Sequence, residues 1–329
     1  MFKGKSFLIT GGTGSFGHTL VNKLLDTDIE NVIVFSRDEA KQHYMRQELP
    51  DPRIKFILGD VRSFDAIAGA LRGVDYVFHA AALKQVPASE SFPWQFVQTN
   101  IQGSHNLLRA ISESSVSRAV FLSTDKAVYP LNAMGMTKAL MEKLVRSDDY
   151  QSQCISVITR YGNVIGSRGS VIPQFIDSIK NRGAVDVTNP QMTRFMMSLE
   201  ESVELVLFAL ANGKSSDLFV QKSPAATVET IVGALAQLLE KSNVKINSVG
   251  IRPGEKIHET LLTGEERSLA IEHEKYFQVK KNLGKGVPNP AAPPVNLIEY
   301  TSANTEILKI EELAKLLASI PMVYELLRK

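Results

Sequence analysis

The sequence has very little cysteine. Cys154 is the only thiol among 329 residues, so no intrachain disulfide can form. It lies in the apolar run CISVIT, where a lone cysteine is typical of a small core residue. A fold that depends on disulfide crosslinks is therefore excluded.

Long apolar runs and an excess of one charge are also missing. The longest apolar run, VELVLFALA, is too short to span a bilayer, and the amino terminus MFKGKSFLITGG lacks the apolar stretch of a signal peptide. Lys and Arg number 37 against 35 Asp and Glu, which gives a net charge of +2 and no basis for a nucleic-acid or membrane surface. We expect a cytoplasmic protein that binds no nucleic acid, no membrane and no metal.

The first half of the sequence alternates two patterns. Short β-branched runs indicate buried strands at 5–10, 31–36, 53–58, 74–80, 118–123 and 155–160. Between them, helical spacing of apolar residues indicates helices at 18–26, 39–49, 64–73, 102–113 and 136–147. Strands that alternate with helices predict an α/β fold with a Rossmann-type, doubly wound parallel sheet.

After Tyr161 this rhythm changes. Helical patterns cover 170–180, 198–211, 228–241 and 309–320, with short strand patterns at 217–222 and 276–280. We predict a Rossmann domain over residues 1–160 and a smaller mixed lobe over 161–329 that ends in a C-terminal helix. Four prolines and two glycines within 282–296 predict a long loop there.

A glycine-rich segment follows the first strand and opens a helix. In TGGTGSFG, glycines fall at Gly11, Gly14 and Gly17, and Thr13, Ser15 and Phe16 complete the turn. Glycine lets the backbone turn tightly and approach a pyrophosphate, which binds at the helix N-terminus. Within a strand–helix–strand unit, this spacing predicts a dinucleotide site.

The second strand ends in FSRDE, which bears on the choice of dinucleotide. Ser36 and Arg37 come first, and a hydroxyl with a guanidinium suits the 2′-phosphate of NADP. NAD-specific sites place a carboxylate here, and Asp38 either caps the next helix or competes as the ribose ligand. We favour NADP. Asp60 and Val61 follow the third strand and are expected to flank the adenine. In HAAALK, Ala80 is expected on the nicotinamide side and Lys84 near the phosphates.

Motifs in a fixed order run along almost the whole chain: ITGGTGSFG, FSRDE, GDVR, HAAALKQVP, TNIQG, LSTDKA, RYGNV, SRGSVIP, MTRFMMSL and IRPGEKIHE. Together they resemble the extended short-chain dehydrogenase/reductase superfamily. Within it, the chain is most similar to the configuration-inverting UDP-N-acetylglucosamine 4,6-dehydratases of flagellin glycosylation and capsule synthesis. The pair Asp125–Lys126 discriminates best, because retaining dehydratases carry Asp-Glu there and simple 4-epimerases carry neither pair.

One position departs from the superfamily pattern. Met134 stands four residues before Lys138, where these enzymes carry a tyrosine, and a thioether is only a weak acceptor. A subgroup on the route to UDP-N-acetyl-L-fucosamine, in capsule and O-antigen synthesis, is similar to this chain in having Met-Gly-x-x-Lys. The resemblance therefore implies an active enzyme whose base for the C4 hydroxyl is reassigned, to a water, to Thr124 relaying to Asp125, or to Tyr129.

The resemblance also implies a reaction. Tightly bound NADP takes a hydride from C4 and returns it to C6 within one turnover. Lys126 removes the C5 proton, which requires a pKa depressed by burial and by nearby Lys84 and Lys138. Asp125 protonates the departing C6 hydroxyl, and Thr124 binds the C4 hydroxyl. The 4-ketone also acidifies C3, so epimerisation at C3 stays open.

The remaining residues that the resemblance implies bind one of the two ligands. Lys138 is expected to hold the nicotinamide ribose, and guanidinium forks with a glutamate suit a uridine diphosphate. The residues on the cofactor side are Ser123, Met134, Lys138 and Val164; those around UDP-N-acetylglucosamine are Lys84, Asn163, Arg168, Val171, Arg194, Arg252 and Glu255. A homo-oligomer, such as a hexamer, is implied as well, with the proline-rich loop reaching a neighbour.

Two other functions stay open. A redox-sensing NADP-binding regulator without turnover is supported only by the missing tyrosine, and it would need neither Lys126 nor the motifs RYGNV, MTRF and IRPGEK. A 4-epimerase or a retaining dehydratase is opposed by the pair Asp125–Lys126.

Overall fold

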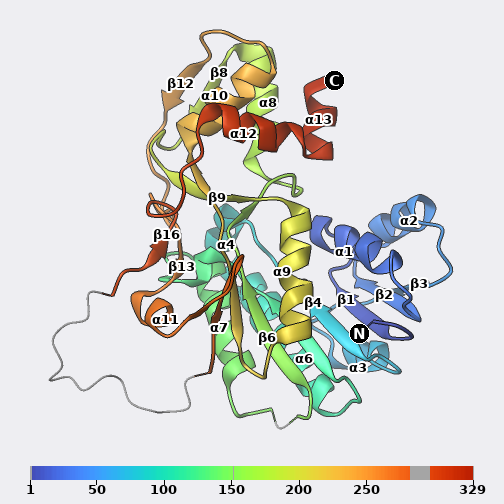
Figure 1. Cartoon of the computed structure of the whole chain (residues 1–329). Helices are drawn as coiled ribbons and strands as arrows, with labels where there is room; N and C mark the ends of the chain where they lie inside the picture. The colour runs from blue at the N-terminus through green and yellow to red at the C-terminus, as the bar shows by residue number, and fades with distance from the viewer. Residues whose placement is uncertain (1, 151, 282–296, 329) are drawn as a thin grey trace, which may run out of the picture.

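The computed structural model describes residues 2–150, 152–281 and 297–328. The predicted proline-rich loop at 282–296 lies outside the described residues. A broad sheet between helices forms the body of the molecule, and a smaller lobe sits at one end of it (Figure 1).

The central sheet has nine strands in the order β14-β15-β10-β6-β5-β4-β1-β2-β3. Neighbours from β10 to β3 are parallel, and β15 and β14 extend the other edge in antiparallel pairs. The order reverses at β1, between β2 and β4, which confirms the predicted doubly wound Rossmann topology. The strands are β1 Ser6–Thr10, β2 Asn31–Ser36, β3 Ile54–Leu58, β4 Tyr76–His79, β5 Arg118–Leu122, β6 Ile155–Arg160, β10 Leu218–Gln221, β14 Ile271–Glu272 and β15 Tyr276–Val279.

Strand β1 shows how the sheet builds a core on both faces. Phe7 and Ile9 belong to the core of one face and Leu8 to the core of the other, and all three are fully buried. Burial of one such side chain contributes roughly 1.5–3 kcal/mol to folding. The covering helices are α1 Ser15–Leu25, α2 Glu39–Glu48 and α9 Leu199–Asn212 on the first face, and α3 Phe64–Ala70, α6 Gly103–Ser112 and α7 Ala133–Arg146 on the second.

The strands and helices predicted for the first 160 residues are all present, with shifted ends. Two short helices between β4 and α6 were not predicted: α4 Val86–Ser91 and α5 Pro93–Phe96. A π-helical stretch, Val97–Gln102, then leads into α6. These segments are too short to show a helical period in the sequence.

Two short strands lie elsewhere than predicted. Sequence patterns place 217–222 and 276–280 in the smaller lobe, but β10 pairs with β6 and β15 pairs with β10 in the central sheet. All four residues of β10 and of β15 are buried, so both strands belong in a core. A short apolar run, however, does not indicate which strand it pairs with. The domain boundary predicted at residue 160 stays a prediction, although the central sheet uses segments from both sides of it.

The smaller lobe packs around a core of its own. Helices predicted at 170–180, 228–241 and 309–320 are confirmed, and they enclose this core together with α13 at the C-terminal end. Its helices are α8 Val171–Arg182, α10 Val228–Leu238, α12 Ile310–Ala318 and α13 Pro321–Arg328. Short strands complete it and join it to the body: β7 Asn163–Val164, β8 Ala184–Val187, β9 Thr193–Met197, β11 Ala225–Thr227, β12 Lys245–Ser248, β13 Thr260–Leu262 and β16 Tyr300–Thr301.

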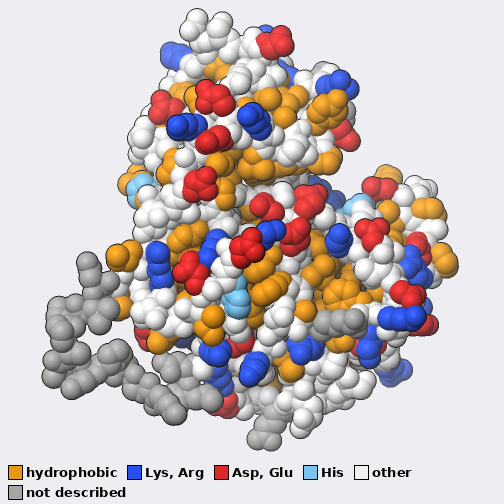
Figure 2. Space-filling view, in the orientation of Figure 1, with side chains coloured by type: hydrophobic (Ala, Val, Ile, Leu, Met, Phe, Trp, Pro, Cys, Tyr) orange, Lys and Arg blue, Asp and Glu red, His pale blue; other side chains and the backbone are white. Residues whose placement is uncertain are grey.

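Figure 2 shows charged side chains of both signs interspersed over the face it presents. This agrees with the nearly balanced charge of the sequence. Within the described ranges, no helix combines the length and the apolar character needed to cross a membrane.

Candidate active site

The glycine-rich turn after β1 is shaped by close backbone packing. Gly11 has φ +68°, and a Cβ there would lie 2.8 Å from the amide nitrogen of Ala81. A Cβ on Gly17 would lie 2.5 Å from Cα of Gly12. Gly14 caps α1 without a side chain, which leaves the first turn of the helix open to a ligand. The turn therefore fits a pyrophosphate at the N-terminus of α1.

Arg168, from the second half of the chain, lies against this turn. The backbone amide of Arg168 donates to Ser15 Oγ at 3.0 Å, and its guanidinium donates to the carbonyl of Thr13. Arg168, assigned to the substrate by resemblance, thus contacts the predicted cofactor loop. Burial and the charge of Arg168 lower the pKa of Lys84. A cavity of about 320 Å³ opens beside this contact, and its wall includes Thr13, Ser15, His18, Lys41, Tyr44 and Arg168.

At the end of β2, the structure separates the roles of three neighbours. Ser36 is buried, and its Oγ accepts from Gln42 at 3.1 Å. Asp38 caps α2 by accepting from a backbone amide at 3.0 Å, so the capping alternative describes it. Arg37 is half exposed, with one guanidinium nitrogen 3.6 Å from Asp60. Arg37 therefore presents a half-exposed guanidinium at this end of the sheet.

The loop after β4 is held in place by one amide side chain. Asn100 accepts from the backbone amide of Leu83 at 2.8 Å and donates to its carbonyl and to Thr137 Oγ1 of α7 at 3.0 Å each. Two predicted cofactor positions lie at the neighbouring strand ends, Val61 buried after β3 and Ala80 half-buried after β4. Asn100 belongs to the motif TNIQG, but its role was not predicted.

The predicted catalytic pair follows β5 in one turn of 3-10 helix, Asp125–Ala127. Asp125 is fully buried, and its Oδ1 accepts from Thr124 Oγ1 at 2.7 Å and from Lys126 Nζ at 3.0 Å. The backbone amide of Asp125 donates to the carbonyl of Tyr161 at 3.1 Å, which fixes the turn against the next segment. The three residues predicted as catalytic are therefore in direct contact.

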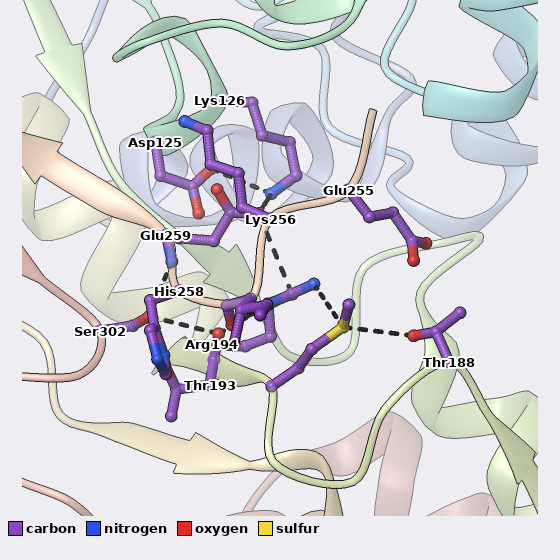
Figure 3. Close-up of polar contacts among 12 residues, drawn as sticks. Asp125, Lys126, Thr188, Thr193, Arg194, Glu255, Lys256, His258, Glu259 and Ser302 are labelled. Atoms are coloured by element: carbon purple, nitrogen blue, oxygen red, sulfur yellow. Dashed lines mark hydrogen bonds and ion pairs between the residues drawn. The ribbon is translucent and has the colours of Figure 1, made fainter. Parts of the chain in front are cut away.

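A fourth charged group, Glu259, comes from a later part of the chain and lies beside Lys126. Oε1 of Glu259, directly before β13, lies 3.5 Å from Lys126 Nζ and 4.0 Å from Arg194 Nε (Figure 3). The backbone amide of Glu259 donates to Ser302 Oγ at 2.9 Å. Glu259 was not predicted, although it closes the motif IRPGEKIHE, whose order was the only signal for it.

The charge state of Lys126 differs from the prediction. Burial lowers its pKa, but the carboxylates of Asp125 and Glu259 raise it by more, so the net shift is upward. The depressed pKa expected for Lys126 is therefore wrong for this state of the protein. The largest charge effects on it come from Asp125, Glu259 and Arg194, and the influence of Lys84 and Lys138 stays a prediction.

Both carboxylates keep a free acceptor atom. Asp125 Oδ2 and Glu259 Oε2 are buried and have no hydrogen-bond partner within the parts of the chain that the structure describes. A buried polar atom without a partner costs about 1–3 kcal/mol. Such a cost is typical of a site that a ligand or water completes.

The vacant tyrosine position is filled by a buried thioether. Met134 lies in the first turn of α7 and is 4% exposed, and Asn132 caps that helix by accepting from the Gly135 amide at 2.8 Å. Tyr129, one candidate for the C4 base, has φ +46° and is 51% exposed. Burial and a hydrogen bond to Glu299 raise its pKa. Thr124, in contrast, already contacts the reactive pair, which favours it among the side-chain candidates.

Lys138 is buried one turn along α7. Its amine donates to the backbone carbonyl of Leu122 and to Met141 Sδ at 3.0 Å. Burial lowers its pKa to about 8, although Glu142 acts in the opposite direction. Ser123 donates to Glu142 in the same layer. Lys138 thus lies beneath the end of β5, while its contact with a nicotinamide ribose stays a prediction.

Of the residues predicted to bind uridine diphosphate, only some lie close to the Lys126 cluster. Arg194, in β9, donates to the carbonyl of Thr193 at 2.8 Å and reaches the Lys126 cluster through Glu259. Arg252 is exposed, and Figure 3 shows Glu255 apart from the cluster. Other predicted positions lie in or beside the smaller lobe: Asn163 and Val164 in β7, with Asn163 Oδ1 buried and unpartnered among the described residues, and Val171 exposed at the start of α8.

Comparison with known proteins places this geometry in a family. The model of a family described as "Polysaccharide biosynthesis protein" matches residues 7–281. A protein of Rickettsia bellii named UDP-glucose 4-epimerase is 46% identical over 340 aligned positions, which cover 100% of this chain and 99% of that protein.

Two solved structures share the architecture. The X-ray structure of Pen from Bacillus thuringiensis has a TM-score of 0.89 and 35% identity, covering 99% of each chain. The dTDP-glucose 4,6-dehydratase of Streptomyces venezuelae, solved with NAD, has a TM-score of 0.70 and 25% identity, covering 77% of this chain and 86% of its own. With a family match over most of its length and a relative of this similarity, the chain belongs to the polysaccharide biosynthesis protein family.

Proposed function

We propose that this protein is a UDP-N-acetylglucosamine 4,6-dehydratase that inverts C5, forming UDP-2-acetamido-2,6-dideoxy-β-L-arabino-hexos-4-ulose for capsule or O-antigen synthesis. One observation carries the proposal: the Lys126 amine and the Asp125 carboxylate meet at the end of β5, 3.0 Å apart. We further propose that NADP and the UDP-sugar bind between the Rossmann sheet and the smaller lobe, and that the enzyme works as a homo-oligomer.

The chemistry of elimination explains why this pair matters. Loss of water across C5 and C6 requires a base at C5 and an acid at the C6 hydroxyl. A simple 4-epimerase needs only hydride exchange and a proton at the C4 hydroxyl. The contact between an amine and a buried carboxylate therefore favours a dehydratase.

In this proposal each side chain has a stated task. When bound, NADP supplies reversible hydride exchange at C4 and C6. Lys126 takes the C5 proton once its amine is neutral, and Asp125 gives a proton to the departing hydroxyl. Thr124, whose hydroxyl donates to Asp125 at 2.7 Å, relays the C4 hydroxyl proton to Asp125 directly or through water, and this supplies the proton that Asp125 gives to the departing hydroxyl. Lys138 and Ser123 support the nicotinamide side.

The two ligands are proposed to bind through cations at the cleft. Arg37 holds the ribose 2′-phosphate, while Lys84 and Arg168 lie at the phosphates. Asn163, Arg194, Arg252 and Glu255 are proposed to receive the uridine diphosphate, since guanidinium groups match phosphate oxygens in geometry and charge. The Streptomyces relative binds NAD, so the choice of NADP rests on Arg37.

A UDP-sugar 4-epimerase is the second candidate, because the Rickettsia relative of that name is 46% identical over the whole chain. Incubation with UDP-N-acetylglucosamine or UDP-glucose, followed by proton NMR, separates the two. A 6-methyl signal with solvent deuterium at C5 is expected for the dehydratase. A C4 epimer that keeps its C6 hydroxymethyl group would establish the epimerase, and two unchanged sugars would favour the non-catalytic regulator.

A further inference from the structure

Glu259 has a position that the proposed reaction does not yet use. Its side chain is buried, and buried glutamates are rare unless they are paired. Oε1 faces the amine of Lys126 at 3.5 Å, while Oε2 has no partner among the described residues. One carboxylate oxygen of Glu259 therefore contacts the Lys126 amine, and the other is left without a partner among the described residues.

The two carboxylates that hold Lys126 come from different parts of the chain. Asp125 is its neighbour in the same turn, and that carboxylate is itself fixed by Thr124. Glu259 comes from the segment before β13, and the hydrogen bond from its backbone amide to Ser302 fixes its backbone. A flexible lysine stem held from one side only could rotate away, whereas contacts on two sides define the position of the amine (Figure 3).

We propose that Glu259 is a positioning residue for Lys126: its carboxylate holds the amine beside Asp125 and sets how readily that amine gives up its proton. The groups that face the amine are the carboxylates of Asp125 and Glu259 and the cations Arg194 and Lys256. Without the charge of Glu259, the Lys126 amine is left near one carboxylate and two cations. The amine then becomes neutral at a lower pH.

The catalytic consequence rests on the proposed function, because only a neutral amine has the lone pair that takes the C5 proton. Glu259 then has two opposed effects on Lys126. It keeps the amine in place, which favours turnover, and it keeps the amine protonated, which delays turnover to higher pH. The two effects can be separated in a profile of kcat against pH. The position of the Lys126 amine sets the height of the plateau, and the charges around it set the pH of the midpoint.

The first test titrates Lys126 directly and needs no turnover. Protein labelled with ¹³C at lysine Cε is titrated by NMR, and the Lys126 signal is identified by its absence from Lys126→Arg. In Glu259→Gln the midpoint is expected to fall by about one pH unit or more. In Glu259→Asp, which keeps the charge, it is expected to return toward the wild-type value.

Glu266→Gln is the matched control, because Glu266 is a half-buried carboxylate of the neighbouring segment that pairs with Arg160 instead. It is expected to leave the Lys126 midpoint in place. A Glu259→Gln midpoint within about 0.3 pH unit of wild type would overturn the proposal, and so would an equal shift in Glu266→Gln. Thermal unfolding of each variant shows that the fold is intact.

The second test measures turnover of UDP-N-acetylglucosamine from pH 6 to 11.5, because the upward shift of the Lys126 pKa places the wild-type rising limb at high pH. In Glu259→Gln, the rising limb of kcat is expected to move to lower pH and the plateau to fall about tenfold, with KM within about threefold of wild type. A structural role alone would lower activity without moving the limb. If wild type forms no product but the NMR midpoint still moves, the proposed function fails while the role of Glu259 stands.

Discussion

Arg160 and Lys126 each lie between two carboxylates, yet the two clusters differ in how completely their atoms are paired. Arg160 contacts Glu142 and Glu266 through several hydrogen bonds and also donates to the Leu261 carbonyl at 2.8 Å. Lys126 contacts Asp125 and Glu259 through one oxygen each. An arginine stays charged in proteins, whereas a lysine can release its proton.

The difference lies in the carboxylate oxygens that each cluster leaves unpaired among the described residues. Around Arg160, both oxygens of Glu142 and of Glu266 accept hydrogen bonds, so nothing is left for a ligand. Around Lys126, one oxygen of each carboxylate has no hydrogen-bond partner among the residues that the structure describes. Each cluster sets one cation between two carboxylates, so the two differ in their unpaired oxygens among the described residues and in whether the cation can titrate.

The largest effect is expected from Lys126→Arg, which keeps the positive charge but cannot act as a base. Elimination should fall by about 10²–10⁴-fold, the usual contribution of a positioned general base. Both ligands should still bind, and reduced cofactor should accumulate after the first hydride transfer. Product NMR in deuterated water and absorbance of the reduced cofactor measure these outcomes.

Lys143→Arg is the control for that variant, because Lys143 lies exposed on α7. It should dehydrate at the wild-type rate. Near wild-type dehydration by Lys126→Arg, with deuterium at C5, would remove Lys126 from the role of base and make Asp125 the next candidate.

The second largest effect is expected on stability, from Arg160→Met. It leaves the buried Glu142 and the half-buried Glu266 without their cation, and breaking a buried pair in this way costs about 3–5 kcal/mol. Urea unfolding should show this loss, while Arg182→Met, in an exposed pair with Asp186, should change stability by less than about 1 kcal/mol. Equal losses in the two variants would contradict the structural role of the Arg160 cluster.

A smaller effect is expected at the end of β2. If Arg37 binds the 2′-phosphate, Arg37→Ala should weaken NADP by about 1.5–3 kcal/mol and leave NAD nearly unchanged. Calorimetry with both cofactors measures the difference. Equal affinity of the wild type for NAD and NADP would overturn the NADP assignment and make Asp38 the candidate ribose ligand.

The smallest effect is expected at the position that lacks tyrosine. Met134→Leu keeps the volume of a buried apolar residue, so it should cost less than about 1.5 kcal/mol and keep most dehydratase activity. Tyr129→Phe should also retain activity, because Thr124 donates to Asp125 at 2.7 Å and is the proposed relay for the C4 proton. A collapse of turnover in Tyr129→Phe alone, with unfolding unchanged, would identify Tyr129 as the C4 base.

The sequence predicts the central part of the fold well, because buried parallel strands are continuous apolar runs that alternate with amphipathic helices. It predicts Thr124, Asp125 and Lys126 as one group, since they are consecutive. It does not predict that β10 joins β6, or that Glu259 reaches Lys126. Those contacts join distant segments, and their partners depend on the packing of the whole chain rather than on any local pattern.

The pairing of β10 with β6 has a consequence for the way this chain assembles. If residues 1–160 were produced alone, β6 would become an outer strand, and its backbone groups around Ile158 would lose the partners that β10 supplies. An exposed, apolar strand edge is a template for pairing with other chains. The amino-terminal half on its own should therefore aggregate, and during synthesis this edge should stay at risk until residues 218–221 have emerged.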